Sequence, residues 1–291
     1  MNKLLLAVMA TAALCTSCAP SQEAASAKFG IQLYSVRELV GNAELYAANH
    51  EQVLSDLASY GYSSIEAANY APGKFYGVSP EQFRADLEAA GLEALSSHTM
   101  RNLTDEELSS GDFSEALAWW DVCIADHKAA GMKYIVCPSF RVPSTLEGLG
   151  TYCRYFNEIG TKCKEAGLAF GIHNHSHEFG RVEGEKIYDF LIANTDPELV
   201  FFQMDVYWAV RGGAAPVHYF REHPGIFTVL HIKDDKELGE SGMVGFDAIF
   251  NNVDAAGTKD YIVEIEGSSV GDIMESCRIS AEYLKNGSFG F

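Results

Sequence analysis

The chain has few basic residues: 21 Lys and Arg stand against 40 Asp and Glu, which gives its 291 residues a formal net charge of −19. Because a phosphate backbone favours clustered Lys and Arg, this balance argues against a nucleic-acid partner. No apolar run long enough to span a bilayer follows the N-terminus, which excludes a transmembrane helix in the body of the chain. The remaining composition is that of an ordinary globular protein.

Two nucleotide-binding motifs and a thiol motif are also missing. No GxGxxG follows the first strand-like run, and GxxxxGK[ST] is absent. Beyond Cys18 the chain has five cysteines without a CxxC pair, at 123, 137, 153, 163 and 277. We expect most of them to be buried small side chains, although one disulfide remains possible in an oxidising compartment.

The N-terminus reads as an export signal. Lys3 precedes the short apolar run Leu4 to Leu14, and small residues lead to Cys18. The segment resembles a bacterial lipoprotein signal, which implies a lipid anchor at Cys18; a plain signal peptide cut elsewhere is the alternative. We therefore expect a signal over 1–17, a small polar tether over 18–28, and an exported, periplasmic or cell-envelope protein whose only membrane contact is the anchor.

A strand-like run recurs every 28 to 40 residues after the tether. The runs begin near Gly30, Tyr62, Glu93, Lys133, Leu168, Leu199, Phe227 and Asp260. Amphipathic segments fill the gaps, and several of these end in a glycine, at 61, 91, 131, 167 and 257. Eight βα units without a spare domain predict a single (β/α)8 TIM barrel over 29–291. The alternative is a doubly wound open sheet, which the missing GxGxxG disfavours.

Ionisable residues gather at the predicted strand ends, where chemistry occurs in such barrels. They are Glu66, His98, His173, His175, Asp205, His231, Lys233, Glu264 and Glu266. Three pairs are spaced by two residues, which places both members on one side of a strand. A converging set of His, Asp and Glu suits one divalent metal ion such as Mn, Co, Zn or Mg. Asp205 alone would also suit a helix cap.

The strands GIQLYS, SIEAAN, SSHT, GIHNHSHEF, MDVYW, LHIKD and IVEIEG resemble those of the xylose isomerase-like barrel superfamily, within it the secreted branch labelled sugar phosphate isomerase/epimerase. The resemblance covers residues 29–285. It implies one metal held by Asp205, His231 and Glu264. Where relatives carry a fourth ligand Glu before Asn, this chain has His173, with His175 and Glu178 as rivals for the role.

The resemblance implies an enzyme that moves a proton next to a carbonyl of a sugar. Candidate proton carriers are Glu66, Glu178, Glu266 and His175, with His98 as a further catalytic candidate. Lys233 is a candidate to stabilise a developing oxyanion. We expect Tyr207 and Trp208 to line the sugar pocket.

Three readings of the function stay open at this point. Export and the lack of a phosphate-binding motif argue against a phosphorylated substrate, so a keto-sugar (3-keto-glycoside) lyase or hydratase in glycan breakdown is an alternative to an isomerase or epimerase. A lipid-anchored sugar-binding protein without turnover is the alternative from another class. DNA repair is disfavoured, because the endonucleases of this fold carry Asp-x-x-His where this chain has Asp205-Val-Tyr-Trp208.

Overall fold

The computed structural model describes residues 28–289. The predicted signal over 1–17 lies outside the described residues, as does the tether apart from Lys28, so both stay predictions. No helix within the described range is both long and apolar enough to cross a bilayer. The five cysteines in this range are buried and free, so none of them forms a disulfide.

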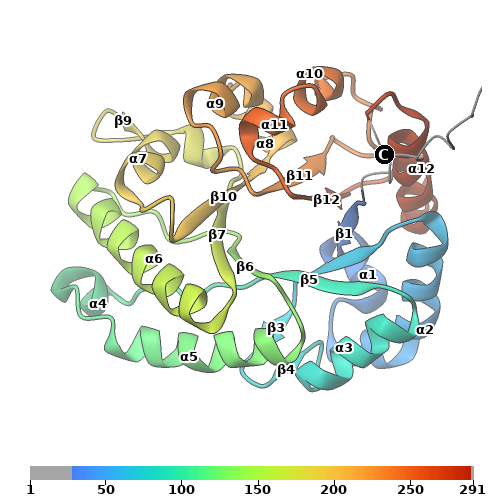
Figure 1. Cartoon of the computed structure of the whole chain (residues 1–291), viewed down its shortest axis with the longest axis horizontal. Helices are drawn as coiled ribbons and strands as arrows, with labels where there is room; N and C mark the ends of the chain where they lie inside the picture. The colour runs from blue at the N-terminus through green and yellow to red at the C-terminus, as the bar shows by residue number, and fades with distance from the viewer. Residues whose placement is uncertain (1–27, 290–291) are drawn as a thin grey trace, which may run out of the picture.

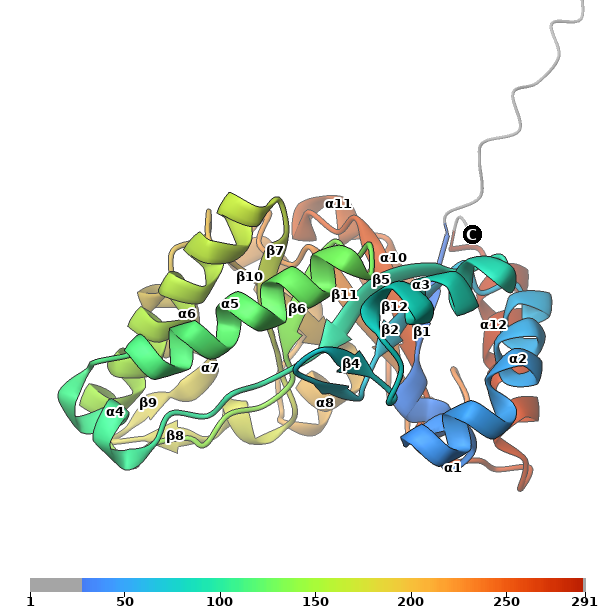
Figure 2. The same ribbon diagram turned by 90° about the horizontal axis from the view of Figure 1, so that it is seen from below.

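Eight parallel strands close into a barrel in the order β1-β12-β11-β10-β7-β6-β5-β2 (Figures 1 and 2). They are β1 (Gly30–Gln32), β2 (Ser64–Ala67), β5 (Glu93–His98), β6 (Tyr134–Cys137), β7 (Ala169–His173), β10 (Val200–Asp205), β11 (Val229–Lys233) and β12 (Asp260–Glu264). Each lies in one of the runs read from the sequence. The prediction of a single TIM barrel is therefore confirmed, and the open sheet is excluded.

Helices cover the outside of the barrel between successive strands (Figure 1). They are η1 (Leu33–Val36), α1 (Arg37–Val40), α2 (Ala43–Tyr60), α3 (Pro80–Ala89), α4 (Asp105–Ser110), α5 (Ser114–Ala129), α6 (Leu146–Ala166), η2 (His177–Phe179), α7 (Ile187–Asn194), α8 (Val206–Arg211), α9 (Pro216–Glu222), α10 (Phe246–Phe250), α11 (Val253–Ala256) and α12 (Ile273–Asn286). The five glycines predicted to end helices all have positive φ, from 76° to 102°. An L-residue rarely adopts that conformation, which explains glycine there.

The interior of the barrel is apolar at one level and polar at the next. A small cluster of buried side chains fills the lower level: Leu95, Tyr134, Val136, Phe201, Val229 and Ile262. Two residues further along their strands, Val229 is followed by His231 and Ile262 by Glu264. Because residues i and i+2 share a face, these polar side chains lie above the apolar layer, at the carboxyl ends of the strands.

Two hairpins rise from the carboxyl ends of the strands. The first is β3 (Tyr70–Ala71) with β4 (Lys74–Phe75), and the second is β8 (Arg181–Val182) with β9 (Glu185–Lys186). Figure 2 shows both on the same side of the molecule as α1 and α8, which also follow strand ends. Long connections therefore surround this mouth of the barrel, where the candidate site lies.

Helix α6 offers a matched test of the packing between helix and barrel. A β-carbon added at Gly160 would lie 2.4 Å from the backbone oxygen of Leu199, whereas one added at Gly150 meets no atom within 4 Å. We expect Gly160→Ala to lower the free energy of unfolding by about 1 to 3 kcal/mol, because the helix must shift. Gly150→Ala should raise it by about 0.5 to 1 kcal/mol, since alanine favours a helix. Urea denaturation measures both, and equal stability of the two variants would contradict this packing.

Candidate metal and catalytic site

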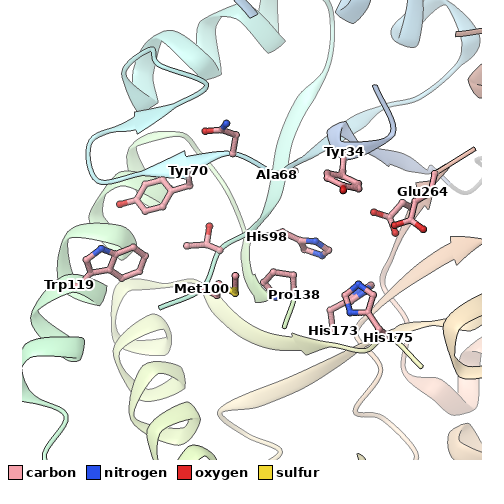
Figure 3. A pocket seen from close by; sticks show the side chains of 13 residues that line it. Tyr34, Ala68, Tyr70, His98, Met100, Trp119, Pro138, His173, His175 and Glu264 are labelled. Atoms are coloured by element: carbon pink, nitrogen blue, oxygen red, sulfur yellow. The ribbon is translucent and has the colours of Figure 1, made fainter. Parts of the chain in front are cut away.

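A cavity of about 540 Å³, called the main cavity below, lies at the carboxyl ends of the strands. It is lined by Tyr34, Ala68, Asn69, Tyr70, His98, Thr99, Met100, Trp119, Pro138, His173, His175, Glu264 and Glu266. Figure 3 shows Tyr70 and Trp119 at one end and Glu264 and His175 at the other. Of the predicted site residues, His98, His173, His175, Glu264 and Glu266 thus share one cavity.

Asp205, His231 and Glu264 come together from three neighbouring strands. His231 Nδ1 lies 3.9 Å from Asp205 Oδ2 and 3.5 Å from Glu264 Oε2. Within residues 28–289, neither Asp205 Oδ2 nor His231 Nδ1 has a hydrogen-bond partner, although both atoms are buried. Leaving buried polar atoms unpaired is costly, so each such group needs an explanation.

A shared metal ion explains these unpaired atoms. Ligand atoms about 2.0 to 2.2 Å from one ion lie roughly 3 to 3.6 Å apart, close to the spacing found here. Asp205 also has two separable roles, because its Oδ1 accepts a hydrogen bond from Trp208 N (2.7 Å) and so caps α8. Its Oδ2 is left for the ion. The donor set of two carboxylates and one imidazole therefore fits a divalent metal.

Glu66 holds the other side of the His231 ring. His231 Nε2 lies 2.6 Å from Glu66 Oε1, which also accepts from Gln32 Nε2 (2.8 Å). The second oxygen, Oε2, accepts from Ser96 Oγ (2.7 Å) and Gln203 Nε2 (2.8 Å). Glu66 is completely buried and does not line the main cavity. This arrangement fixes the His231 ring so that Nδ1 faces Asp205 and Glu264, as is usual for a histidine that binds a metal.

The charges in this cluster are strongly coupled. Burial, helped by the nearby Glu264 carboxylate, raises the pKa of Asp205 to about 7, because the opposing charges of His231 and Lys233 do not compensate for the loss of solvation. Burial disfavours a charged His231, but the Glu66 and Glu264 carboxylates outweigh it and raise the pKa of His231 to about 10. Burial also opposes ionisation of Glu66, yet His98 and His231 hold its pKa well below the usual range. The cluster thus concentrates negative charge that a cation would neutralise.

The fifth strand of the barrel, β7, supplies more than one candidate for a further ligand. His173 Nδ1 lies 3.0 Å from Gln203 Oε1, and its Nε2 is buried without a hydrogen bond to any described residue. His173 groups with His98 and His231 at distances that suit a metal, whereas His175 groups with His177 and Glu178. The assignment of His173 as the fourth ligand stays a prediction.

Glu178 lies behind His175 and not in the main cavity. Its Oε2 accepts a hydrogen bond from His175 N (2.8 Å), and its Oε1 lies 2.9 Å from His177 Nε2. Glu178 is fully buried, so it orients the segment that follows β7. His175 itself lines the main cavity, and burial lowers the pKa of its imidazole, which favours the uncharged ring.

Lys233 and Glu266 form a pair at the wall of the main cavity. Lys233 is buried, and its Nζ lies 3.1 Å from Glu266 Oε2. The rings of Tyr207 and Trp208 lie beside the ammonium group, at 5.0 Å and 5.6 Å from Nζ. These two aromatic residues are therefore placed around Lys233, and neither lines the main cavity.

Tyr34, Tyr70 and Trp119 line the main cavity, and the sequence did not predict these aromatic side chains as part of the site. It also missed Gln32, Ser96 and Gln203, the partners of Glu66. Here a signal was available: Gln203 and Ser96 stand two residues before Asp205 and His98, on the same face of their strands.

Comparison with known proteins agrees with the fold. The family model described as xylose isomerase-like TIM barrel matches residues 54–286. A sugar phosphate isomerase/epimerase from Parabacteroides distasonis superimposes with a TM-score of 0.82 at 33% identity, covering 91% of this chain and all of that one. A D-allulose 3-epimerase from Methylomonas sp. shares the fold, with a TM-score of 0.67 at 14% identity, covering 90% and 98% of the two chains.

One curated relative also matches by sequence. An inosose dehydratase from Geobacillus kaustophilus is 26% identical over 200 residues, which are 63% of this chain. The match spans 61% of the length of that relative. The family match covers most of the chain and agrees with the closed barrel, so this protein belongs to the xylose isomerase-like TIM barrel family.

Proposed function

We propose that the protein is a divalent-metal-dependent enzyme of the isomerase/epimerase type, which removes a proton next to a carbonyl group of a sugar. The observation that carries the proposal is the pair of buried, unpaired ligand atoms on Asp205 and His231, beside Glu264 at the wall of the main cavity. A divalent ion bound there supplies Lewis acidity toward a substrate oxygen, which makes the neighbouring C–H more acidic.

Two residues of the main cavity are placed to carry the proton. His175 follows β7, and its uncharged ring has a buried Nδ1 without a hydrogen bond to any described residue. Glu266 follows β12, which two strands separate from β7 in the barrel. Two carriers that approach from different strands suit a reaction in which one group removes a proton and another returns it. Lys233 is paired with Glu266 and does not line the main cavity, so its proposed role is to orient the Glu266 carboxylate.

The substrate is proposed to carry no phosphate group. None of the residues that line the main cavity is Lys or Arg, while Glu264 and Glu266 both line it. A phosphate dianion would meet carboxylates without a cation of its own, because Lys233 is already paired with Glu266. A neutral sugar, whose hydroxyl groups can donate hydrogen bonds to Glu264 and Glu266, is compatible with this acidic lining.

A lyase or hydratase acting on a keto-sugar is the second candidate. The same proton removal next to a carbonyl is followed by cleavage of the C–O bond one carbon further, and the leaving oxygen takes up a proton. The match to a protein named inosose dehydratase favours this candidate.

Deuterium exchange tests the proposal and separates its two forms. The metal-loaded protein is incubated in D2O with free keto-sugars, aldoses and 3-keto-glycosides, and products are read by mass spectrometry and NMR. We expect deuterium at the carbon next to the carbonyl, and at least about 100-fold slower exchange in Glu266→Gln if Glu266 carries the proton. A new epimer or isomer indicates the first reaction, and a lost leaving group the second. Bound sugar without exchange on any substrate would contradict catalysis and favour a sugar-binding protein.

A further inference from the structure

A second cavity of about 410 Å³, called the side cavity below, adjoins the main cavity. It is lined by Ser35, Arg37, Glu38, Glu266, Gly267, Ser268, Gly271, Asp272 and Ile273. Glu266 lines both cavities, and the neighbouring residues Tyr34 and Ser35 line one each. The two cavities therefore meet at Glu266 and Tyr34, next to the end of the main cavity that holds Glu264.

The boundary between the cavities carries an aromatic ring and a free cation. Tyr34 is 44% exposed and lines the main cavity, so its ring is accessible to a ligand there. The Arg37 guanidinium lies 4.4 Å from the centre of the Tyr34 ring, and its Nη1 donates to Tyr34 O (3.0 Å). Within residues 28–289, no carboxylate forms an ion pair with Arg37, so its remaining N–H groups can donate to a ligand.

The side cavity does not suit an anion. Arg37 is its one basic lining residue, whereas Glu38, Glu266 and Asp272 are acidic. A ligand group with many hydroxyls would accept from the guanidinium and donate to the carboxylates without adding charge. The exposed Tyr34 ring offers an apolar face for the C–H side of a sugar ring. Both features describe a neutral carbohydrate unit.

We propose that the side cavity binds a second, neutral sugar unit, so that the substrate is a glycoside whose reacting ring occupies the main cavity. This inference rests on the proposed function for the identity of the reacting ring. Tyr34 and Arg37 then lie where the two units join, and Glu266 contacts both.

Calorimetric titration of the Mn-loaded protein tests this inference with matched pairs of sugars. The probes are glucose with cellobiose, maltose and gentiobiose, galactose with lactose, and glucose 6-phosphate. We expect at least one disaccharide to bind about 10-fold or more tightly than its own monosaccharide, because the second unit gains charge-assisted hydrogen bonds. Glucose 6-phosphate should bind no more tightly than glucose. Disaccharides that bind no better than their monosaccharides, or do not bind at all, would overturn the inference.

Substitution of Arg37 tests whether the tighter binding of disaccharides arises in the side cavity. We expect Arg37→Met to remove most of the preference for the disaccharide, about 10-fold, and to change monosaccharide affinity less than twofold. Arg154→Met is the matched control, because Arg154 is an exposed arginine of α6 that lines neither the main cavity nor the side cavity. An equal loss for both sugars in Arg37→Met would contradict a separate subsite. Binding is measured without turnover, so a protein that prefers disaccharides yet exchanges no deuterium would refute the proposed function and leave the subsite standing.

Discussion

Asp205→Asn should bind a divalent ion at least about 100-fold more weakly than the unchanged protein and lose deuterium exchange with it. The substitution removes the charge at the unpaired Oδ2 while an amide oxygen still accepts from Trp208 N and caps α8. Removing a residue that merely orients a ligand already costs about 10- to 100-fold in affinity, so loss of a ligand should cost more. Titration with Mn²⁺ or Zn²⁺, followed by calorimetry, measures the effect.

Thermal stability gives a second readout of the same variant. A metal that binds only the folded protein raises Tm, so the unchanged protein should gain stability on loading while Asp205→Asn gains little. Without metal, Asp205→Asn should be the more stable of the two, because it no longer buries a carboxylate whose Oδ2 lacks a partner. Asp235→Asn is the control: Asp235 is exposed and accepts from Tyr207 OH, outside the cluster. Unchanged metal affinity in Asp205→Asn would refute the ligand assignment.

The barrel was readable from the sequence because its strands are buried on both faces and recur at a regular spacing. The polar residues Asp205, His231 and Glu264 were recognisable too, since they stand in largely apolar runs at or near the carboxyl ends of β10, β11 and β12. Neighbouring parallel strands then bring these residues together: Asp205 is paired in register with His231.

Helix starts were less readable, and this explains where Tyr207 and Trp208 lie. The run from Leu199 to Trp208 reads as one apolar strand, but in the structure the strand ends at Asp205 and α8 begins at once. The Asp205 cap turns the chain, so both rings lie beside Lys233 instead of lining the main cavity. The aromatic lining comes from Tyr34, Tyr70 and Trp119, which lie in η1, β3 and α5, and no periodic pattern marks them.

The role of Glu66 could not be read from the sequence, because its partners are distant along the chain. It bonds to Gln32, Ser96, Gln203 and His231, which lie 30 to 165 residues away on four other strands. From its place at a strand end, Glu66 reads equally as a catalytic base or as a structural carboxylate. Glu66 also lies 3.0 Å from His98 Nε2 through its Oε1. Its complete burial and its many partners favour a positioning role, which predicts a specific behaviour on substitution.

Glu66→Gln should weaken metal binding about 10- to 100-fold, because an amide holds the His231 Nε2–H less strongly and makes Nδ1 a poorer ligand. Glutamine has the same shape as the fully buried glutamate, so its amide oxygen can still accept some of the hydrogen bonds that Glu66 accepts. Glu107→Gln is the matched control, since Glu107 is a buried carboxylate paired with Arg101, away from the cluster. That variant should lose stability and keep its metal affinity.

The deciding comparison sets the metal affinity of Glu66→Gln against its rate of deuterium exchange. If Glu66 positions His231, saturating Mn²⁺ should restore a large part of the exchange, because the proton carriers at the main cavity are intact. If Glu66 were itself the base, exchange would stay lost at saturating metal while the affinity equalled that of the unchanged protein. The pKa of His231, followed by NMR in the metal-free protein, separates the two independently: it should fall in Glu66→Gln, since a carboxylate that raises it has been neutralised.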